Sequence, residues 1–349
     1  MKIVVLKPDA IGDFLIACGA IRLLADAVGE ENLVLSVRTE VEPLARREFP
    51  GAAFIPLPLQ RRRRGRNITA VNIYHCFPAW LKLCRLRADT MVCLRSMRNF
   101  LTTAFFISPR VRRRVAPENV LLRAKRVRRH AVEKWMRRIF RPELVPYPAP
   151  RAGMPSDLES HRLVVAEVLG RGVSDAEIMP ILRSATWRGG NHWLLCPFSS
   201  NKQKDYSPEN WIASLREVAS LVPAGGLRLA GAGNQRDRLE EFASAMREAG
   251  LPFPVAVDEA VDLSVFPETV SKAALVLTVD TATAHFACAM RAPAVIVACG
   301  INPDVYGPYS PDGRQHWLVG EWDRVGRSRW QETVLPADVA SAIRRAASA

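Results

Sequence analysis

The segment LVLTVDTATAHFACAMRAPAVIVACGINPDVYGP, residues 275–308, decides the fold predicted for this chain. It begins with a continuous, largely apolar run, LVLTV, which is typical of a strand buried on both faces of a parallel sheet. An acid and a threonine follow, then an Ala-rich helical stretch over 283–290, and from Pro293 a second apolar run, AVIVAC. This order of strand, turn, helix and strand predicts an open α/β sheet.

The turn between the two strands has the features of an anion site. Asp280 and Thr281 fall at the carboxyl end of the first strand, where open α/β sheets bind ligands. A helix N-terminus there offers free N–H groups and a partial positive charge, so we predict a diphosphate ligand. The alternative is that Asp280 only caps the helix. His285 and a Gly-containing loop over 300–307 favour the ligand site.

Length and composition indicate a globular protein. The chain has 349 residues, 48% of them hydrophobic, which is enough for two domains with separate cores. Charged residues interrupt every apolar run before the ~18 residues of a membrane span, and the N-terminus lacks a signal-peptide pattern, so we expect a cytoplasmic protein. The seven cysteines include no CxxC pair, so we expect reduced, mostly buried thiols and no metal site.

Positive charge is concentrated in the first half of the chain. Residues 1–150 contain 29 Lys and Arg against 12 Asp and Glu, whereas the remainder contains 20 against 23. From Arg61 to Arg141, 23 basic residues accompany three acids. Runs such as RRRRGR (61–66) and RVRRR (110–114) are either solvated faces or contacts for a polyanion. The polyanion would be a phosphorylated acceptor, an anionic membrane face or nucleic acid.

Strands and helices alternate along both halves, which predicts two doubly wound parallel sheets. Strands are expected at 2–7, 32–37, 53–57, 90–94, 193–198, 226–230, 253–257, 275–279 and 294–299. Helices are expected from the turn at 8–13 to about residue 28, and at 41–48, 99–106, 131–140, 156–170, 208–220, 235–249 and 283–290. Residues 142–155 are expected to form a loop.

The domain boundary is predicted in the connection over 171–190. An N-terminal domain then covers 1–180 and a C-terminal domain covers 181–330. The remaining segment, 331–349, contains a last helix at 336–347. This helix is expected to pack either on the C-terminal domain or back on the N-terminal domain.

Three further turns place functional side chains at the ends of predicted strands. Gly12 and Asp13 lie at the start of the first helix. Asp13 either stabilises the helix through a favourable interaction with its dipole or accepts a proton from an attacking hydroxyl. The dipole is expected to lower the pKa of Asp13. The loop after the 193–198 strand, SSNKQKDY, offers hydroxyls and an ammonium to phosphate oxygens, although loop lysines are ordinarily inert. The turn AGAGNQRDR (230–238) is a tight βα turn or an approach to a nucleoside.

These motifs together resemble glycosyltransferase family 9, the ADP-heptose:lipopolysaccharide heptosyltransferases. The opening KIVVLKPDAIGDFLIACGAIRLL (2–24) is similar to the family's first strand, GD turn and helix. CPFSSNKQKDYSPENW (196–211) resembles its hydroxyl-rich loop, lysine and helix start. VDTATAHFACAMRAPAVIVACGINPDVYGPY (279–309) resembles the DTGxxH signature, the Ala-rich helix and the Gly-Pro loop. The resemblance spans nearly the whole chain.

The resemblance implies an α/β GT-B fold, in which two Rossmann-like domains with parallel sheets face an interdomain cleft. The N-terminal domain, 1–180, would then be acceptor-binding, and the C-terminal domain, 181–330, nucleotide-sugar-binding. It implies an inverting, metal-independent transfer of heptose from ADP-heptose, without a cofactor. Asp13 matches the catalytic base, and Lys204 stabilises charge on the departing ADP. The donor-binding residues are then Ser199, Ser200, Lys204, Gly231, Gln235, Asp280, Thr281, Ala282 and His285, with Asp237 a second candidate for the ribose. The acceptor-binding residues are Gly12, Arg61, Arg62, Arg95 and Arg98.

Three residues depart from the family pattern. Ala282 replaces the signature Gly and adds a methyl group where the backbone approaches phosphate. Gly19 replaces the usual Pro of the first helix, and Cys18 the usual small polar residue.

The family's acceptors carry lipid A phosphates and Kdo carboxylates, which suits the basic first half. We therefore expect an anionic glycan or glycolipid acceptor, such as the lipopolysaccharide inner core. We also expect peripheral contact with an anionic membrane at the cytoplasmic face of the inner membrane. One alternative is a related enzyme with another nucleotide sugar or acceptor. Another is a nucleic-acid-binding protein on a Rossmann scaffold, although no RNP, KH or helix-turn-helix pattern supports it and no nucleic-acid partner is expected.

Overall fold

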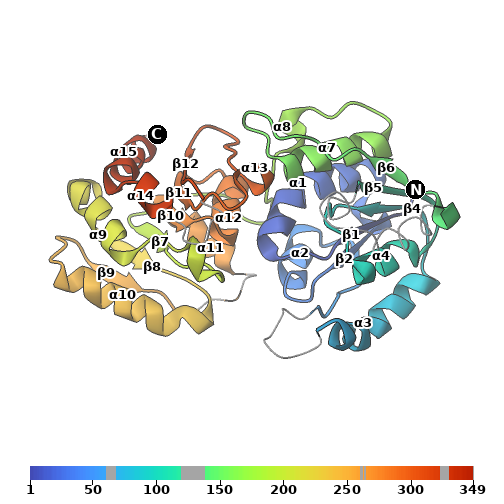
Figure 1. Cartoon of the computed structure of the whole chain (residues 1–349), viewed down its shortest axis with the longest axis horizontal. Helices are drawn as coiled ribbons and strands as arrows, with labels where there is room; N and C mark the ends of the chain where they lie inside the picture. Colours follow the sequence, from blue (N-terminus) through green and yellow to red (C-terminus); the bar gives the residue numbers. More distant parts are fainter. Residues whose placement is uncertain (60–67, 119–137, 260–261, 263–264, 323–329, 349) are drawn as a thin grey trace. The chain divides into compact units, whose positions relative to one another are not determined.

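The computed structural model describes residues 1–59, 68–118, 138–259, 262, 265–322 and 330–348. The chain divides into two compact units. The first comprises Met1–Arg151 and Ser156–Met179, and the second Ala152–Pro155 and Pro180–Ala349. Each unit is a parallel sheet covered by helices (Figure 1), as predicted from the alternating elements.

The first unit contains a six-stranded parallel sheet in the order β3-β2-β1-β4-β5-β6. Its strands are β1 (Ile3–Lys7), β2 (Leu33–Val37), β3 (Ala53–Phe54), β4 (Arg87–Cys93), β5 (Arg110–Pro117) and β6 (Glu143–Val145). Its helices are α1 (Ile11–Val28), η1 (Glu30–Asn32), α2 (Glu42–Glu48), α3 (Ile68–Arg85), α4 (Phe100–Ile107), α7 (Ser156–Leu169) and α8 (Asp175–Ile178). The strand order reverses between β1 and β4, and ligands of doubly wound sheets bind at the carboxyl side of such a point.

The second unit repeats this topology, in the order β12-β11-β10-β7-β8-β9. Its strands are β7 (Trp193–Cys196), β8 (Leu227–Leu229), β9 (Val255–Val257), β10 (Leu275–Val279), β11 (Ala294–Ala298) and β12 (Gln315–Val319). Its helices are η2 (Lys202–Lys204), α9 (Pro208–Glu217), η3 (Ala219–Leu221), η4 (Gly233–Gln235), α10 (Arg236–Glu248), α11 (Phe266–Ser271), α12 (Ala282–Met290), α13 (Pro303–Tyr306), α14 (Trp330–Thr333) and α15 (Pro336–Ala347). The order reverses between β7 and β10, which lie side by side.

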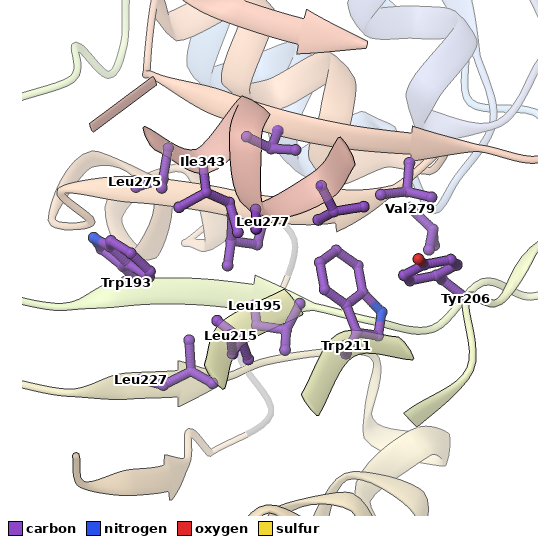
Figure 2. Close-up of a cluster of buried hydrophobic side chains, with 14 of the residues drawn as sticks. Trp193, Leu195, Tyr206, Trp211, Leu215, Leu227, Leu275, Leu277, Val279 and Ile343 are labelled. Atoms are coloured by element: carbon purple, nitrogen blue, oxygen red, sulfur yellow. The ribbon is translucent and has the colours of Figure 1, made fainter. Parts of the chain in front are cut away.

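The core of the second unit is built around the strand that opens the diagnostic segment. All five residues of β10 are buried, as the apolar run predicts for a central parallel strand. Figure 2 shows Leu275 and Leu277 of β10 packed between Ile343 of α15 and the side chains of β7 and α9. The last helix therefore belongs to the second unit, because Ile343 and its neighbours complete this core. Contact of this helix with the N-terminal domain stays a prediction.

Several elements were not predicted. The sheet strands β5, β6 and β12 and the helices α3, α8, α11, α13 and α14 are absent from the expected pattern. β5 was interpreted as a charged run, and β6 lies within the stretch expected to be a loop. The helix predicted over 131–140 lies outside the described residues except for its last three, which are helical.

The cysteines are free thiols among the described residues, and all but Cys84 are buried, as predicted. No described helix is long and apolar enough to cross a membrane. Over the described ranges, no group of three His, Cys, Asp or Glu side chains is arranged to hold a metal ion.

Gly19, one of the residues that depart from the resembled pattern, occupies a tightly packed position in α1. A Cβ atom there would overlap the carbonyl oxygen of Ile178 and lie 2.6 Å from that of Met179. Because both neighbours are backbone, α1 would have to move away from the chain that follows α8. The glycine thus permits the close approach of α1 to this segment.

We expect Gly19→Ala to lower the free energy of unfolding by about 1–3 kcal/mol, the usual cost of overpacking. Chemical denaturation would measure it. Gly172→Ala is the control, since nothing lies within 4 Å of a Cβ at Gly172. Equal stability of the two variants would contradict the close packing of α1.

Candidate active site

Two predicted donor residues meet where the second sheet reverses its strand order. Lys204, in the loop after β7, donates from Nζ to the Asp280 carboxylate after β10 at 2.7 Å, and to the Asp280 main-chain oxygen at 3.3 Å. The Lys204 and Asp280 side chains are 24% and 21% exposed, so the ion pair remains open to a ligand. This is the position at which doubly wound sheets bind ligands.

Asp280 does not cap α12, which removes the alternative interpretation of this residue. The N-cap is Thr281, and its side chain makes no capping hydrogen bond to the helix. Thr281 instead lies with its hydroxyl 3.3 Å from that of Thr278. The first turn of α12 therefore starts beside the Lys204 ammonium, so that an ammonium group and helix N–H groups lie at one edge of the sheet.

The loop that carries Lys204 is held from several sides. The Asp205 carboxylate accepts from the Ser199 main-chain N–H at 2.6 Å and from the Arg238 guanidinium at 2.6 Å. The Arg238 guanidinium also lies over the Phe198 ring, 3.9 Å from its centroid. The Trp330 indole N–H donates to the Gln203 oxygen at 3.0 Å. Ser199 is buried and Ser200 is exposed. The loop thus fixes the direction of Lys204 before any ligand binds.

The role of Asp205 and Arg238 was missed by the sequence analysis. Asp205 is adjacent to Lys204, but its partners come from β7's end and from α10, 33 residues away along the chain. The local signal in the sequence was the acid that directly follows the two lysines of the run KQKD (202–205).

His285 lies in a buried aromatic cluster. Its Nδ1 is 3.0 Å from the Tyr309 hydroxyl, and its ring stacks on that of Tyr309 with Trp317 nearby. His285 is 5% exposed and Tyr309 is 2% exposed. This position favours a packing role for His285 between α12 and the segment that carries Tyr309, and contact of His285 with the donor stays a prediction.

The turn after β8 is closed by the Gln235 side chain. Its Oε1 accepts from the Ala232 N–H at 3.0 Å, and would lie 2.6 Å from a Cβ at Gly231. Gly231 therefore makes room for the Gln235 amide, as expected for a tight βα turn. Asp237, the other candidate for the ribose, is exposed in the first turn of α10.

A shallow depression adjoins Asp280 at the carboxyl ends of β10 and β11. The described residues that line it include Gly300, Asn302, Tyr306 and Trp317. Gly300 adopts a φ of +78°, and a Cβ there would overlap the Gly320 oxygen, so glycine is required. Ala282, the departure from the family signature, is half-buried at the start of α12.

The first unit places a buried ionic cluster where its own strand order reverses. Lys7, 1% exposed at the end of β1, donates to the Leu94 oxygen after β4 at 2.8 Å. Its Nζ lies 3.2 Å from the Asp9 carboxylate and 3.7 Å from that of Asp157 in α7. His161 of α7 completes the cluster, with Nε2 at 3.4 Å from Nζ. Burial and the Lys7 charge lower the pKa of His161 to about 4, so the imidazole is neutral at pH 7.

Asp13 lies in the first turn of α1, beside this cluster. Burial, and then repulsion from Asp9, raise the pKa of Asp13 to about 7, although Lys7 and Arg95 act in the opposite direction. The expectation that the helix dipole lowers this pKa is wrong, because burial and a second carboxylate outweigh the dipole. A carboxylate with a pKa near 7 suits a general base. Gly12, the preceding residue, lies in the same turn.

The arginines predicted to contact the acceptor differ in their surroundings. Arg95 is 25% exposed and pairs with Asp9 at 2.9 Å, close to Asp13. Arg98 is 3% exposed and donates to the Pro117 oxygen at 2.6 Å, which favours a structural role. Arg61 and Arg62 lie outside the described residues. Acceptor contact by each of these residues stays a prediction.

The sequence model of glycosyltransferase family 9 (heptosyltransferase) matches residues 113–331. The chain belongs to glycosyltransferase family 9. It is therefore a glycosyltransferase, as the resemblance implied. No curated protein matches the chain in sequence.

Solved structures of heptosyltransferases and of a family 9 glycosyl transferase share this fold. The chain resembles E. coli heptosyltransferase WaaC with ADP at a TM-score of 0.71 and 15% identity, over 99% of this chain and 100% of WaaC. E. coli ADP-heptose lps heptosyltransferase II matches at 0.67 and 13%, over 100% and 99%. The family 9 glycosyl transferase from Veillonella parvula matches at 0.68 and 12%, over 99% and 97%. At these identities the likeness shows the fold, which is GT-B with two Rossmann-like units, as predicted.

Proposed function

We propose that this family 9 enzyme transfers heptose from ADP-heptose to a hydroxyl group of an anionic glycan, such as the lipopolysaccharide inner core, with inversion at the anomeric carbon. The observation that carries the proposal is the pairing of Lys204 with Asp280 beside the start of α12, at the ligand edge of the second sheet. WaaC was solved with ADP and with ADP-2-deoxy-2-fluoro heptose, which supports the choice of donor.

In this proposal the second unit stabilises the leaving group. As the glycosidic bond breaks, negative charge develops on the diphosphate, and the Lys204 ammonium and the N–H groups of α12 are positioned to receive it. Asp280 cannot donate to phosphate oxygens, so its proposed role is to orient Lys204. No metal ion or cofactor takes part in the proposal.

The first unit supplies the base. Asp13 accepts the proton of the acceptor hydroxyl as its oxygen attacks the anomeric carbon from the face opposite the diphosphate. One in-line attack inverts the configuration and needs no covalent intermediate. The surplus of positive charge in the first half of the chain supports an acceptor that carries phosphate or carboxylate groups, and a location at the cytoplasmic face of an anionic membrane.

The rate of transfer is expected to rise with pH through about 7, because Asp13 must lose its proton to act as a base. Arg95→Gln should move this rise to higher pH, since the Arg95 guanidinium lowers the pKa of Asp13. The measurement is kcat/KM against pH for the wild type and for Arg95→Gln. Arg46→Gln, an exposed arginine of α2 paired with Glu42, is the control and should leave the profile unchanged. If kcat/KM does not change between pH 5.5 and 8.5, a range of roughly 1.5 pH units to either side of the Asp13 pKa, Asp13 is not the base.

Donor titration in the absence of an acceptor tests the donor half of the proposal separately. Calorimetry with ADP-heptose, ADP, UDP-glucose and GDP-mannose should show binding of the two adenosine ligands and weaker binding of the others. Tighter binding of a uridine or guanosine ligand would reassign the donor while leaving the enzyme class unchanged.

A further inference from the structure

A cavity in the described surface of the first unit lies away from the proposed active site. It measures about 680 Å³ and opens at the amino ends of β1, β4 and β5. The N-terminus of the chain, marked N in Figure 1, enters β1 at this edge. The described residues that line it include Lys2, Arg87, Asp89, Arg110, Arg112 and Arg114.

Three exposed arginines of this cavity have no partner among the described residues. Arg87 begins β4 and stands opposite Arg110, the first residue of β5, in the parallel register. Arg112 follows two residues later on the same face of β5. No carboxylate in the described part of the chain pairs with these three guanidinium groups, although like charges directly opposite one another destabilise a sheet.

The neighbouring Arg113 is an arginine of β5 that has a structural role. Arg113 points to the other face of the strand and binds Glu143 of β6 and Glu167 of α7, at 2.6 and 2.9 Å. The charge of Arg113 is thus neutralised by carboxylates, whereas no carboxylate among the described residues compensates the charge of Arg87, Arg110 and Arg112. Stability does not account for this group, so a ligand is the simplest reason for it.

The remaining polar groups of the cavity leave the positive charge in excess. Asp89 is the acid among the described lining residues, and its carboxylate already accepts the Lys2 main-chain N–H at 2.7 Å. Arg114 donates to the Pro109 oxygen at 2.6 Å, and its buried Nε has no partner within the described residues.

The position of the cavity excludes a role in the proposed chemistry. Lys2 and Lys7 stand at opposite ends of β1, and five residues of strand span roughly 17 Å at about 3.3 Å a residue. Asp13 and Arg95 belong to the carboxyl edge of the same sheet. A ligand at the amino edge is thus held without meeting the reacting groups.

We propose that the cavity formed by Arg87, Arg110 and Arg112 is a second anion site that binds phosphate groups. Guanidinium groups bind phosphate through paired, charge-assisted hydrogen bonds, and several together suit a diphosphate or a phosphorylated head group. The phosphate comes either from a lipid head group, which would anchor the enzyme to a membrane, or from a soluble phosphate compound. This site is independent of the donor and of the transfer reaction.

The test compares Arg110→Gln/Arg112→Gln with Arg216→Gln/Arg247→Gln, which removes two exposed arginines of the second unit. All variants carry Lys204→Ala, so that the donor site does not compete for the probe. One probe is inorganic diphosphate, measured by calorimetry. The other is sedimentation with phosphatidylcholine vesicles, with or without phosphatidic acid. We expect the first variant to lose affinity for one probe about tenfold or more, the effect of losing at least one charge-assisted hydrogen bond.

The two probes distinguish the sources. Loss of vesicle binding identifies a lipid head group, and loss of diphosphate binding alone identifies a soluble ligand. Equal binding by the two double variants overturns the proposal. Because Arg87 and Arg110 repel each other, Arg110→Gln/Arg112→Gln in the Lys204→Ala background should melt at the temperature of the Lys204→Ala protein or above it. If it melts lower, Arg87→Gln serves in its place, with the same tenfold loss expected and equal binding again overturning the proposal.

Discussion

Replacing Asp13 with Asn is expected to lower the rate of heptose transfer by about 10²–10⁴-fold, the usual contribution of a general base. The amide has the shape of the carboxylate but cannot accept a proton at neutral pH. Asp13→Ala should abolish transfer in the same way. Donor affinity should be unchanged in both variants, because the groups proposed to bind the diphosphate belong to the second unit.

The measurement pairs single-turnover rates with calorimetric titration of ADP-heptose. Asp26→Asn is the control, since Asp26 is an exposed acid of the same helix. Loss of donor binding in Asp13→Asn, with the fold intact, would move Asp13 out of the base role and into the donor site.

Replacing Lys204 with Ala is expected to lower kcat by about 10²–10³-fold, as for other groups that stabilise a charge formed in the transition state. Donor affinity should fall as well, because the ammonium also binds the diphosphate before reaction. Lys204→Arg should recover part of the rate, since it keeps the charge but changes its geometry.

Lys202→Ala is the matched control for this effect. Lys202 belongs to the same short helix, η2, but is exposed and has no carboxylate partner in the described structure. Its replacement should leave kcat within about twofold, as for most surface positions. An equal loss in the two variants would show that total loop charge matters rather than the position fixed by Asp280.

The diagnostic segment could be predicted because its physics is local. The strand β10 is buried on both faces, so its sequence is apolar, and the helix α12 follows within the same segment. The proximity of Lys204 and Asp280 also follows from topology. The strands β7 and β10 are neighbours at the point where the strand order reverses, and Lys204 and Asp280 follow the carboxyl ends of these two strands.

The strand β5 could not be predicted from its arginine run. Its register depends on β4 and β6, and Arg113 is compensated by Glu143 and Glu167, far away in the sequence. The helix α3 was missed for a different reason, since Pro78 lies inside it and proline ordinarily ends a helical pattern.

The electrostatics of Asp13 illustrate a second limit. The sequence places Asp13 at a helix start, where the dipole alone predicts a lowered pKa. The raised pKa comes from burial and from Asp9, in a cluster completed by Asp157 and His161 of α7. Lys7 and His161 in this cluster are 154 residues apart in the sequence. A local sequence pattern therefore cannot predict the cluster.

Release of nucleotide from a panel of nucleotide sugars, with and without a deep-core lipopolysaccharide acceptor, tests the central claim most directly. The account predicts that ADP-heptose alone is stable, and that ADP appears with a heptosylated product of inverted anomeric configuration when the acceptor is added. Turnover of another nucleotide sugar with ADP-heptose left intact would contradict it.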